Sequence, residues 1–202
     1  DDIKGKVRLH TPRHKIVGTS EHIAFSRSGF VYAFVRLGFE LDPGEEARSQ
    51  KYGFASAKFT IHLWGEGNLQ PSIYDLYPYE INHGKPSSVK LKLEPSITLV
   101  SGAGASLGGL ETDMVVGQVA PTVRGFKGDE ERTPYWNLQS HRESPLYGLR
   151  HFWVLIEAPQ KLKRCYLIPF VETTMQSAWG LIPLGPDIDQ VEHRPRYVID
   201  FA

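Results

Sequence analysis

Residues 30–41, FVYAFVRLGFEL, decide the fold class of this chain. Apolar side chains alternate along this stretch with the two-residue period of a β-strand that buries one face. The polar face carries Arg36 and Glu40. The apolar face carries Val31, Ala33, Val35, Leu37, Phe39 and Leu41. We therefore predict a half-buried strand here.

Two more segments repeat this alternation. Residues 57–64 place Ala57, Phe59, Ile61 and Leu63 on one side, with Lys58, Thr60 and His62 on the other. Residues 89–94 place Val89, Leu91 and Leu93 on one side, with Lys90, Lys92 and Glu94 on the other. One-sided polarity of this kind is typical of antiparallel sheets that have one solvated face.

Residues 149–158 differ because both faces are largely apolar, which predicts a central strand that is covered on both sides. Residues 165–171 are similar, but Pro169 lacks the backbone N–H that a ladder needs, which predicts an edge, a bulge or an early end. Residues 196–201 predict a last strand. Weaker strand patterns cover residues 7–10, 22–25, 73–79, 97–100, 114–120 and 122–126.

The helical signal is poor. Residues 45–52 follow the turn pair Pro43-Gly44 and lack an apolar stripe of helical period, so we predict a loop with at most one helical turn. About ten short strands with almost no helix predict an all-β fold, an antiparallel β-sandwich of jelly-roll or immunoglobulin-like type with roughly 8–12 strands. Because sandwiches of this length commonly form one unit, residues 1–202 are predicted to be a single domain.

Composition restricts the function classes. Lys plus Arg and Asp plus Glu both number 23, so the formal charge is zero and nucleic acid is an unfavoured partner. The single cysteine, Cys165, cannot form an internal disulfide and favours a reducing, cytoplasmic location. No apolar run approaches the length of about 18 residues that a membrane-spanning helix needs. The chain begins Asp1-Asp2 without Met, which predicts a processed or excised piece.

A glycine-rich turn, Gly102-Ala103-Gly104-Ala105-Ser106, follows the strand-like residues 97–100. It resembles the dinucleotide-binding turn of sirtuin deacylases, a resemblance that would imply a helix directly after the turn and four cysteines for zinc. The chain instead continues through Gly108-Gly109 into β-branched residues, and it has one cysteine. We therefore interpret the turn as a flexible hairpin tip or a strand lined by small residues, and we predict no cofactor.

Catalytic and metal-binding patterns are weak. His10 and His14 have a helical chelating spacing, but Pro12 lies between them in a strand-like segment, so no metal site is predicted. Cys165 follows Lys163-Arg164, whose charges could activate a thiol, but a buried apolar filler is the favoured interpretation. No catalytic residue is assigned, and we lean against an enzyme.

One basic stretch contains Arg8, His10, Arg13, His14 and Lys15, and a second contains Lys161, Lys163 and Arg164. Both could contact phosphates. The alternative is that they are solvated surface charge that protects sheet edges against aggregation.

The longest irregular stretch, residues 125–147, is the predicted contact surface, because loops carry function and because Trp, Tyr and Arg are common interface anchors. The predicted binding residues are Tyr135, Trp136, His141 and Arg142. The alternative is that Trp136 and Leu138 close the open end of the sandwich.

The sequence thus favours a non-catalytic binding or interaction module, a domain of a larger protein that contacts another protein. The first alternative is a carbohydrate-active sandwich enzyme with paired carboxylates or a metal. A second is carbohydrate binding by exposed tryptophans such as Trp64 and Trp136, and a third is an assembly subunit.

Overall fold

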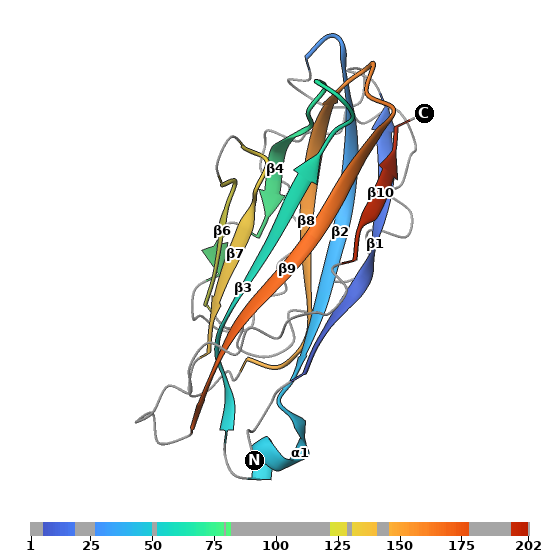
Figure 1. Cartoon of the computed structure of the whole chain (residues 1–202). Coiled ribbons are helices and arrows are strands. Elements are labelled where there is room, and N and C mark those ends of the chain that lie inside the picture. The colour runs from blue at the N-terminus through green and yellow to red at the C-terminus, as the bar shows by residue number, and fades with distance from the viewer. Residues whose placement is uncertain are drawn as a thin grey trace, which may run out of the picture.

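The computed structural model describes residues 6–18, 27–49, 52–78, 80–81, 122–128, 131–140, 146–177 and 195–201. Its strands are β1 (Lys6–Gly18), β2 (Phe30–Asp42), β3 (Tyr52–Trp64), β4 (Ser72–Tyr77), β5 (Glu80–Ile81), β6 (Thr122–Phe126), β7 (Tyr135–Gln139), β8 (Gly148–Pro159), β9 (Arg164–Ser177) and β10 (Tyr197–Asp200). One short helix, α1 (Gly44–Ser49), joins β2 to β3. Long, steeply twisted strands dominate the molecule (Figure 1).

The strands form two antiparallel sheets. One has the order β1-β2-β8-β4 and the other the order β10-β9-β3-β7-β6-β5. The inward faces of both sheets supply one apolar core, as the two-residue alternation of β2 and β3 requires. The predicted all-β antiparallel sandwich is therefore confirmed.

An aromatic cluster joins the sheets at the centre of this core. Phe39 and Phe152 come from the first sheet, and Phe59 and Trp136 come from the second. The ring centroids of Phe152 and Trp136 are 4.7 Å apart, and those of Phe39 and Phe59 are 5.0 Å apart. Each contact joins the two layers, so the cluster fixes how the sheets are seated on one another.

The individual strand predictions fare unevenly. Residues 30–41 and 149–158 become β2 and β8, and β8 is central, between β2 and β4, as its two apolar faces predicted. The predicted strands at 22–25, 89–94, 97–100 and 114–120 lie outside the described residues. Residues 125–147 were predicted to be irregular, and this is wrong for Tyr135–Gln139, which form β7 and pair with both β3 and β6.

Pro169 neither ends nor bulges β9, which pairs with β3 without a register shift at this position. Its partner is Ile61, whose own N–H donates to the carbonyl of Pro134 on the opposite side of β3. The Ile61–Pro169 pair is therefore one that exchanges no backbone hydrogen bonds, and the missing N–H of Pro169 faces away from β3. The register of β10 ends before that point, at Tyr197 and Leu167. Among the described residues, no strand pairs with β9 at Pro169 on the side away from β3, so the predicted edge exists there, but only locally.

Candidate functional site

The predicted contact residues do not form one surface. Tyr135 and Trp136 are neighbours in β7, so their side chains point to opposite faces of the sheet. The ring of Tyr135 is half-buried and stacks on Phe126, and Nζ of Lys58 lies 4.8 Å from its centroid. His141 and Arg142 lie outside the described residues.

Trp136 is completely buried and belongs to the aromatic cluster of the core. Its indole N–H donates a 3.1 Å hydrogen bond to the carbonyl of Pro78. Burial with a satisfied donor is the arrangement expected of a structural tryptophan. Trp136 therefore packs inside the sandwich, and its ring is not available to a partner.

Cys165 is also buried, and burial raises the pKa of its thiol to about 12. A thiol of this kind is protonated at neutral pH and is a poor nucleophile, which agrees with the apolar-filler interpretation. Among the described residues, no group of three His, Cys, Asp or Glu side chains is placed to hold a metal ion.

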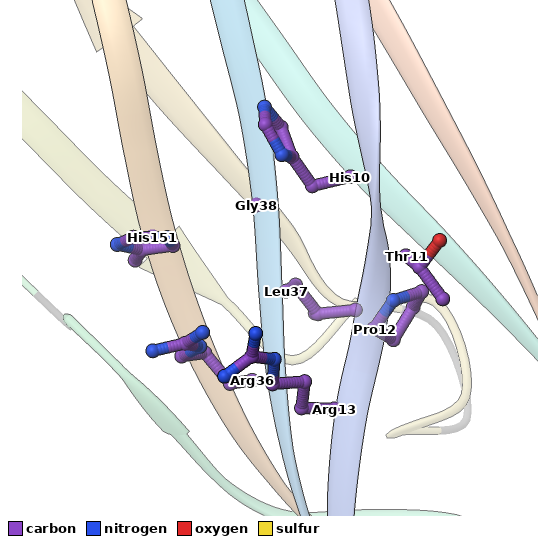
Figure 2. A pocket seen from close by; sticks show the side chains of 8 residues that line it. All are labelled: His10, Thr11, Pro12, Arg13, Arg36, Leu37, Gly38 and His151. Atoms are coloured by element: carbon purple, nitrogen blue, oxygen red, sulfur yellow. The ribbon is translucent and has the colours of Figure 1, made fainter. Parts of the chain in front are cut away.

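A groove of about 330 Å³ lies on the face of the first sheet that points away from the core (Figure 2). Its walls come from three adjacent strands: His10, Thr11, Pro12 and Arg13 from β1, Arg36, Leu37 and Gly38 from β2, and His151 from β8. No acidic residue is among these eight. We call this the cationic groove.

A β-bulge creates the groove. His10 and Arg13 are three positions apart, so in a regular strand their side chains would point to opposite faces. In β1, however, His10 is opposite Gly38 and Arg13 is opposite Arg36, with a register shift between them. The extra residue, at Thr11-Pro12, changes the direction of the following side chains, so that His10 and Arg13 lie on the same face of the sheet. Bulges next to functional sites commonly reorient a side chain in this way.

Gly38 forms the floor between the two histidines. It is opposite His10 on one side and His151 on the other. A Cβ atom at this position would lie 3.1 Å from Cδ2 of His151 and 3.5 Å from Cβ of His10. Any side chain at position 38 would therefore crowd the space between the two imidazoles.

The groove is electrostatically positive. The pKa of His151 is lowered, first by burial and then by the charges of Arg36, His10 and Arg13. The carboxylate of Glu40 lies 3.9 Å from Nε2 of His10 and 3.8 Å from an Nη atom of Arg8, so it partly balances the outer end. Arg13 and Arg36, directly opposite one another, lie together at the other end (Figure 2).

The sequence showed half of this site. The basic stretch from Arg8 to Lys15 includes His10 and Arg13, and Arg36 occupies the polar face of residues 30–41. What the sequence did not show was the pairing of β1, β2 and β8. A proline in a strand otherwise rich in basic residues was the available signal for a bulge.

A second feature lies at the end of the other sheet, where β5 pairs with β6. Glu80 is opposite Arg124, and Ile81 is opposite Val123. The two strands are adjacent and antiparallel, and residues 82–121, which lie outside the described residues, separate them in sequence. Separately, the described part of the chain contains no helix with the length and hydropathy needed to cross a bilayer.

The chain matches no protein-family model and no curated protein. Solved structures do show similar strand layouts. A structure described as a pore-forming protein and the delta-toxin of Clostridium perfringens each align with a TM-score of 0.44 and 8% identity. Both alignments cover 85% of this chain, and they cover 79% and 77% of the other chains respectively. The membrane-inserted form of the Clostridium perfringens NetB toxin aligns with a TM-score of 0.38 and 10% identity over 85% of each chain.

This comparison contradicts the functional prediction. The sequence favoured a non-catalytic module that contacts another protein, with a carbohydrate-binding or carbohydrate-active enzyme as the alternative, whereas these structures are described as pore-forming proteins. The carbohydrate-binding alternative relied on exposed Trp64 and Trp136. Trp64 is 55% exposed, but Trp136 is fully buried and offers no ring for a sugar to stack on. The likeness concerns strand layout, and what this chain does is argued below from its own residues.

Proposed function

We propose that this chain inserts residues 82–121 into a lipid bilayer as an amphipathic β-hairpin and forms a pore together with other copies of itself. The observation that carries the proposal is the pairing of Ile81 with Val123 at the sheet edge. Because both ends of the insertion are held on adjacent antiparallel strands, continuing those two strands would produce a hairpin.

The sequence of the insertion suits a bilayer. Apolar residues occupy alternate positions at Val89, Leu91, Leu93, Ile97 and Leu99, with lysines and hydroxyl side chains between many of them. No charged side chain occurs between Glu94 and Glu111, and the glycine-rich turn lies within that interval. Alternation over a strand of about 9–11 residues is the pattern of a membrane-crossing β-strand, with lipid on one face and water on the other.

Backbone hydrogen bonding supplies the reason for several copies. A single hairpin in hydrocarbon would leave the N–H and C=O groups of both outer edges without partners, at a cost of several kcal/mol for each group. Hairpins from neighbouring copies satisfy those edges. The alternating polar face then lines a water-filled passage.

Dye release from phosphatidylcholine vesicles, without and with phosphatidic acid, tests the proposal. Leu99→Asp places a charge on the predicted lipid face and should strongly reduce release, since a charged side chain that faces lipid destabilises a membrane-crossing strand. Thr98→Asp is the matched control, one residue away on the predicted water face, and should retain most of the release. Both variants should keep the wild-type melting temperature.

Two outcomes would overturn the proposal. One is the absence of release by the wild-type chain from either vesicle type. The other is equal loss of release in both Asp variants, which would mean that the alternation has no lipid-facing side. Environment-sensitive labels on cysteines introduced at positions 97, 98 and 99 give a second readout, because the buried native thiol of Cys165 should stay unlabelled.

A further inference from the structure

We infer that the cationic groove on the outer face of the first sheet is a binding site for a phosphate group, held chiefly by Arg13 and Arg36. The inference does not depend on membrane insertion, because the groove is built from β1, β2 and β8 and not from the sheet that carries residues 82–121.

The first argument is the concentration of guanidinium groups. Arg13 and Arg36 are cross-strand partners, and their side chains lie together on the same face of the sheet (Figure 2). His10 and His151 lie farther along the groove, on either side of Gly38. An anion bound between the two guanidinium groups would be attracted to both of them.

The second argument is chemical fit. The guanidinium fork presents planar N–H donors that match phosphate oxygens, and charge-assisted hydrogen bonds of this type are roughly twice as strong as neutral ones. The imidazoles of His10 and His151 add donors when protonated. The volume of about 330 Å³ falls at the lower end of small-ligand sites, which suits a phosphate group and part of its carrier.

The third argument is the backbone. The bulge at Thr11-Pro12 shifts the register of β1 against β2 by one residue and aligns Arg13 with the other cations. Gly38 keeps the floor open, because a Cβ at that position would crowd His151 at 3.1 Å. The bulge in β1 and the glycine in β2 thus both shape the cationic groove.

A further donor lies beside the groove. The ring of Trp153 is 6.0 Å from that of His151, and by register Trp153 is opposite Arg36. Its buried indole N–H has no hydrogen-bond partner in the structure of the described residues. Buried donors normally have acceptors, but Trp153 does not itself line the groove, so no contact with the anion is assigned to it.

Isothermal titration of the full chain with inorganic phosphate tests the inference. We expect a dissociation constant of about 1 mM or tighter, the affinity of a few charge-assisted contacts. Arg13→Ser, an exposed position, should weaken binding about tenfold or more. Gly38→Ala should also weaken it by crowding the floor.

Arg8→Ser is the matched control, because it removes one exposed arginine from the same strand outside the groove. It should change the affinity less than about twofold. Equal losses in Arg8→Ser and Arg13→Ser would show a diffuse charge effect and overturn the site. So would the absence of any heat of binding with phosphate at concentrations well above 1 mM.

The carrier of the phosphate group is distinguished by two further arms. Co-sedimentation with vesicles of phosphatidylcholine containing phosphatidic acid reports a lipid headgroup, and competition by soluble phosphate shows that both use the groove. If soluble phosphate binds and the vesicles do not, the ligand is a soluble phosphate compound. Phosphate titration needs no bilayer, so phosphate binding can be detected even if the chain releases no dye. Dye release can likewise occur even if the groove binds no phosphate.

Discussion

The phenolic hydroxyl of Tyr32 donates a 2.7 Å hydrogen bond to Oε2 of Glu157, and both side chains are buried on the outer face of the first sheet. Glu157 also accepts from the guanidinium of Arg27, and the backbone N–H of Arg27 donates to the Tyr32 hydroxyl at 2.9 Å. A buried carboxylate is tolerated only when it is hydrogen-bonded and paired, so these contacts depend on one another.

Tyr32→Phe should therefore lower the free energy of unfolding by about 1–3 kcal/mol, because it leaves one oxygen of Glu157 with fewer donors in a buried site. Urea denaturation at neutral pH measures this. Tyr147→Phe is the control, since Tyr147 is 52% exposed, and it should change stability by less than about 0.5 kcal/mol. An equal effect of the two substitutions would show that the Tyr32 bond contributes nothing.

The same hydroxyl predicts an alkaline effect. Burial, followed by the hydrogen bond to Glu157, raises the pKa of Tyr32 to about 12, whereas in the unfolded chain it is about 10. The unfolded state loses its proton first, so this contribution to stability is complete below pH 10 and is lost as pH approaches 12. The stability gap between wild type and Tyr32→Phe should therefore narrow across that range in urea titrations. A constant gap would contradict the shifted pKa.

How far the sequence predicts the fold depends on strand length. In β2 and β8 the alternation runs for many residues, and the period identifies both the strand and its buried face. In β7, Trp136 and Leu138 are too few to define a period, and only pairing with Phe59 and Ala57 of β3 makes them a strand. Whether a short segment forms a strand depends on its pairing with distant parts of the chain, and the local sequence does not reveal that pairing.

The cationic groove shows the same limit. Arg13 and Arg36 each read as solvated charges along their own strands, and nothing in one sequence states that they are cross-strand partners. Trp136 shows the opposite error, because its residue type suggested a contact anchor while its register placed it in the core. Residue type suggests chemistry, but strand pairing decides which face that chemistry occupies.

Gly125 should be intolerant of any side chain. A Cβ at this position in β6 would lie 2.5 Å from the carbonyl oxygen of Pro78 and 2.9 Å from Nε1 of Trp136, the two atoms joined by the Trp136 hydrogen bond. Gly125→Ala should thus break that bond, loosen the pairing of β6 with β7, and cost about 2 kcal/mol or more. Thermal unfolding with tryptophan fluorescence measures both effects.

Gly53 supplies the matched control, because a Cβ there would meet nothing within 4 Å. Gly53→Ala should leave stability unchanged or raise it by about 0.4–1 kcal/mol through a less flexible unfolded chain. If both alanine variants melt together, the close packing around Gly125 does not limit stability.

Cys165 should be inert until the sandwich opens. With its pKa raised to about 12, the thiolate fraction at pH 8 is on the order of 10⁻⁴, and the sulfur is buried as well. We expect a disulfide reagent such as dithionitrobenzoate to react at a rate that follows unfolding, rising steeply through the urea transition. Rapid labelling in the absence of denaturant would show that β9 opens locally beside Ile199, its cross-strand partner.

The groove should bind anions more tightly at acidic pH. The pKa of His151 is lowered by burial and by Arg36, His10 and Arg13, so its imidazole is neutral at pH 8 in the empty groove and gains a proton as pH falls. An anion favours the protonated form of His151, so binding of the anion should be coupled to the uptake of a proton.

Sulfate is the suitable probe, because phosphate monoesters change their own charge near pH 6. We expect sulfate to bind about 3- to 10-fold more tightly at pH 5.5 than at pH 8. His151→Asn should reduce that difference. A pH profile that is equally steep in the variant would show that His151 does not sense the anion, and a flat wild-type profile would place the anion away from both imidazoles.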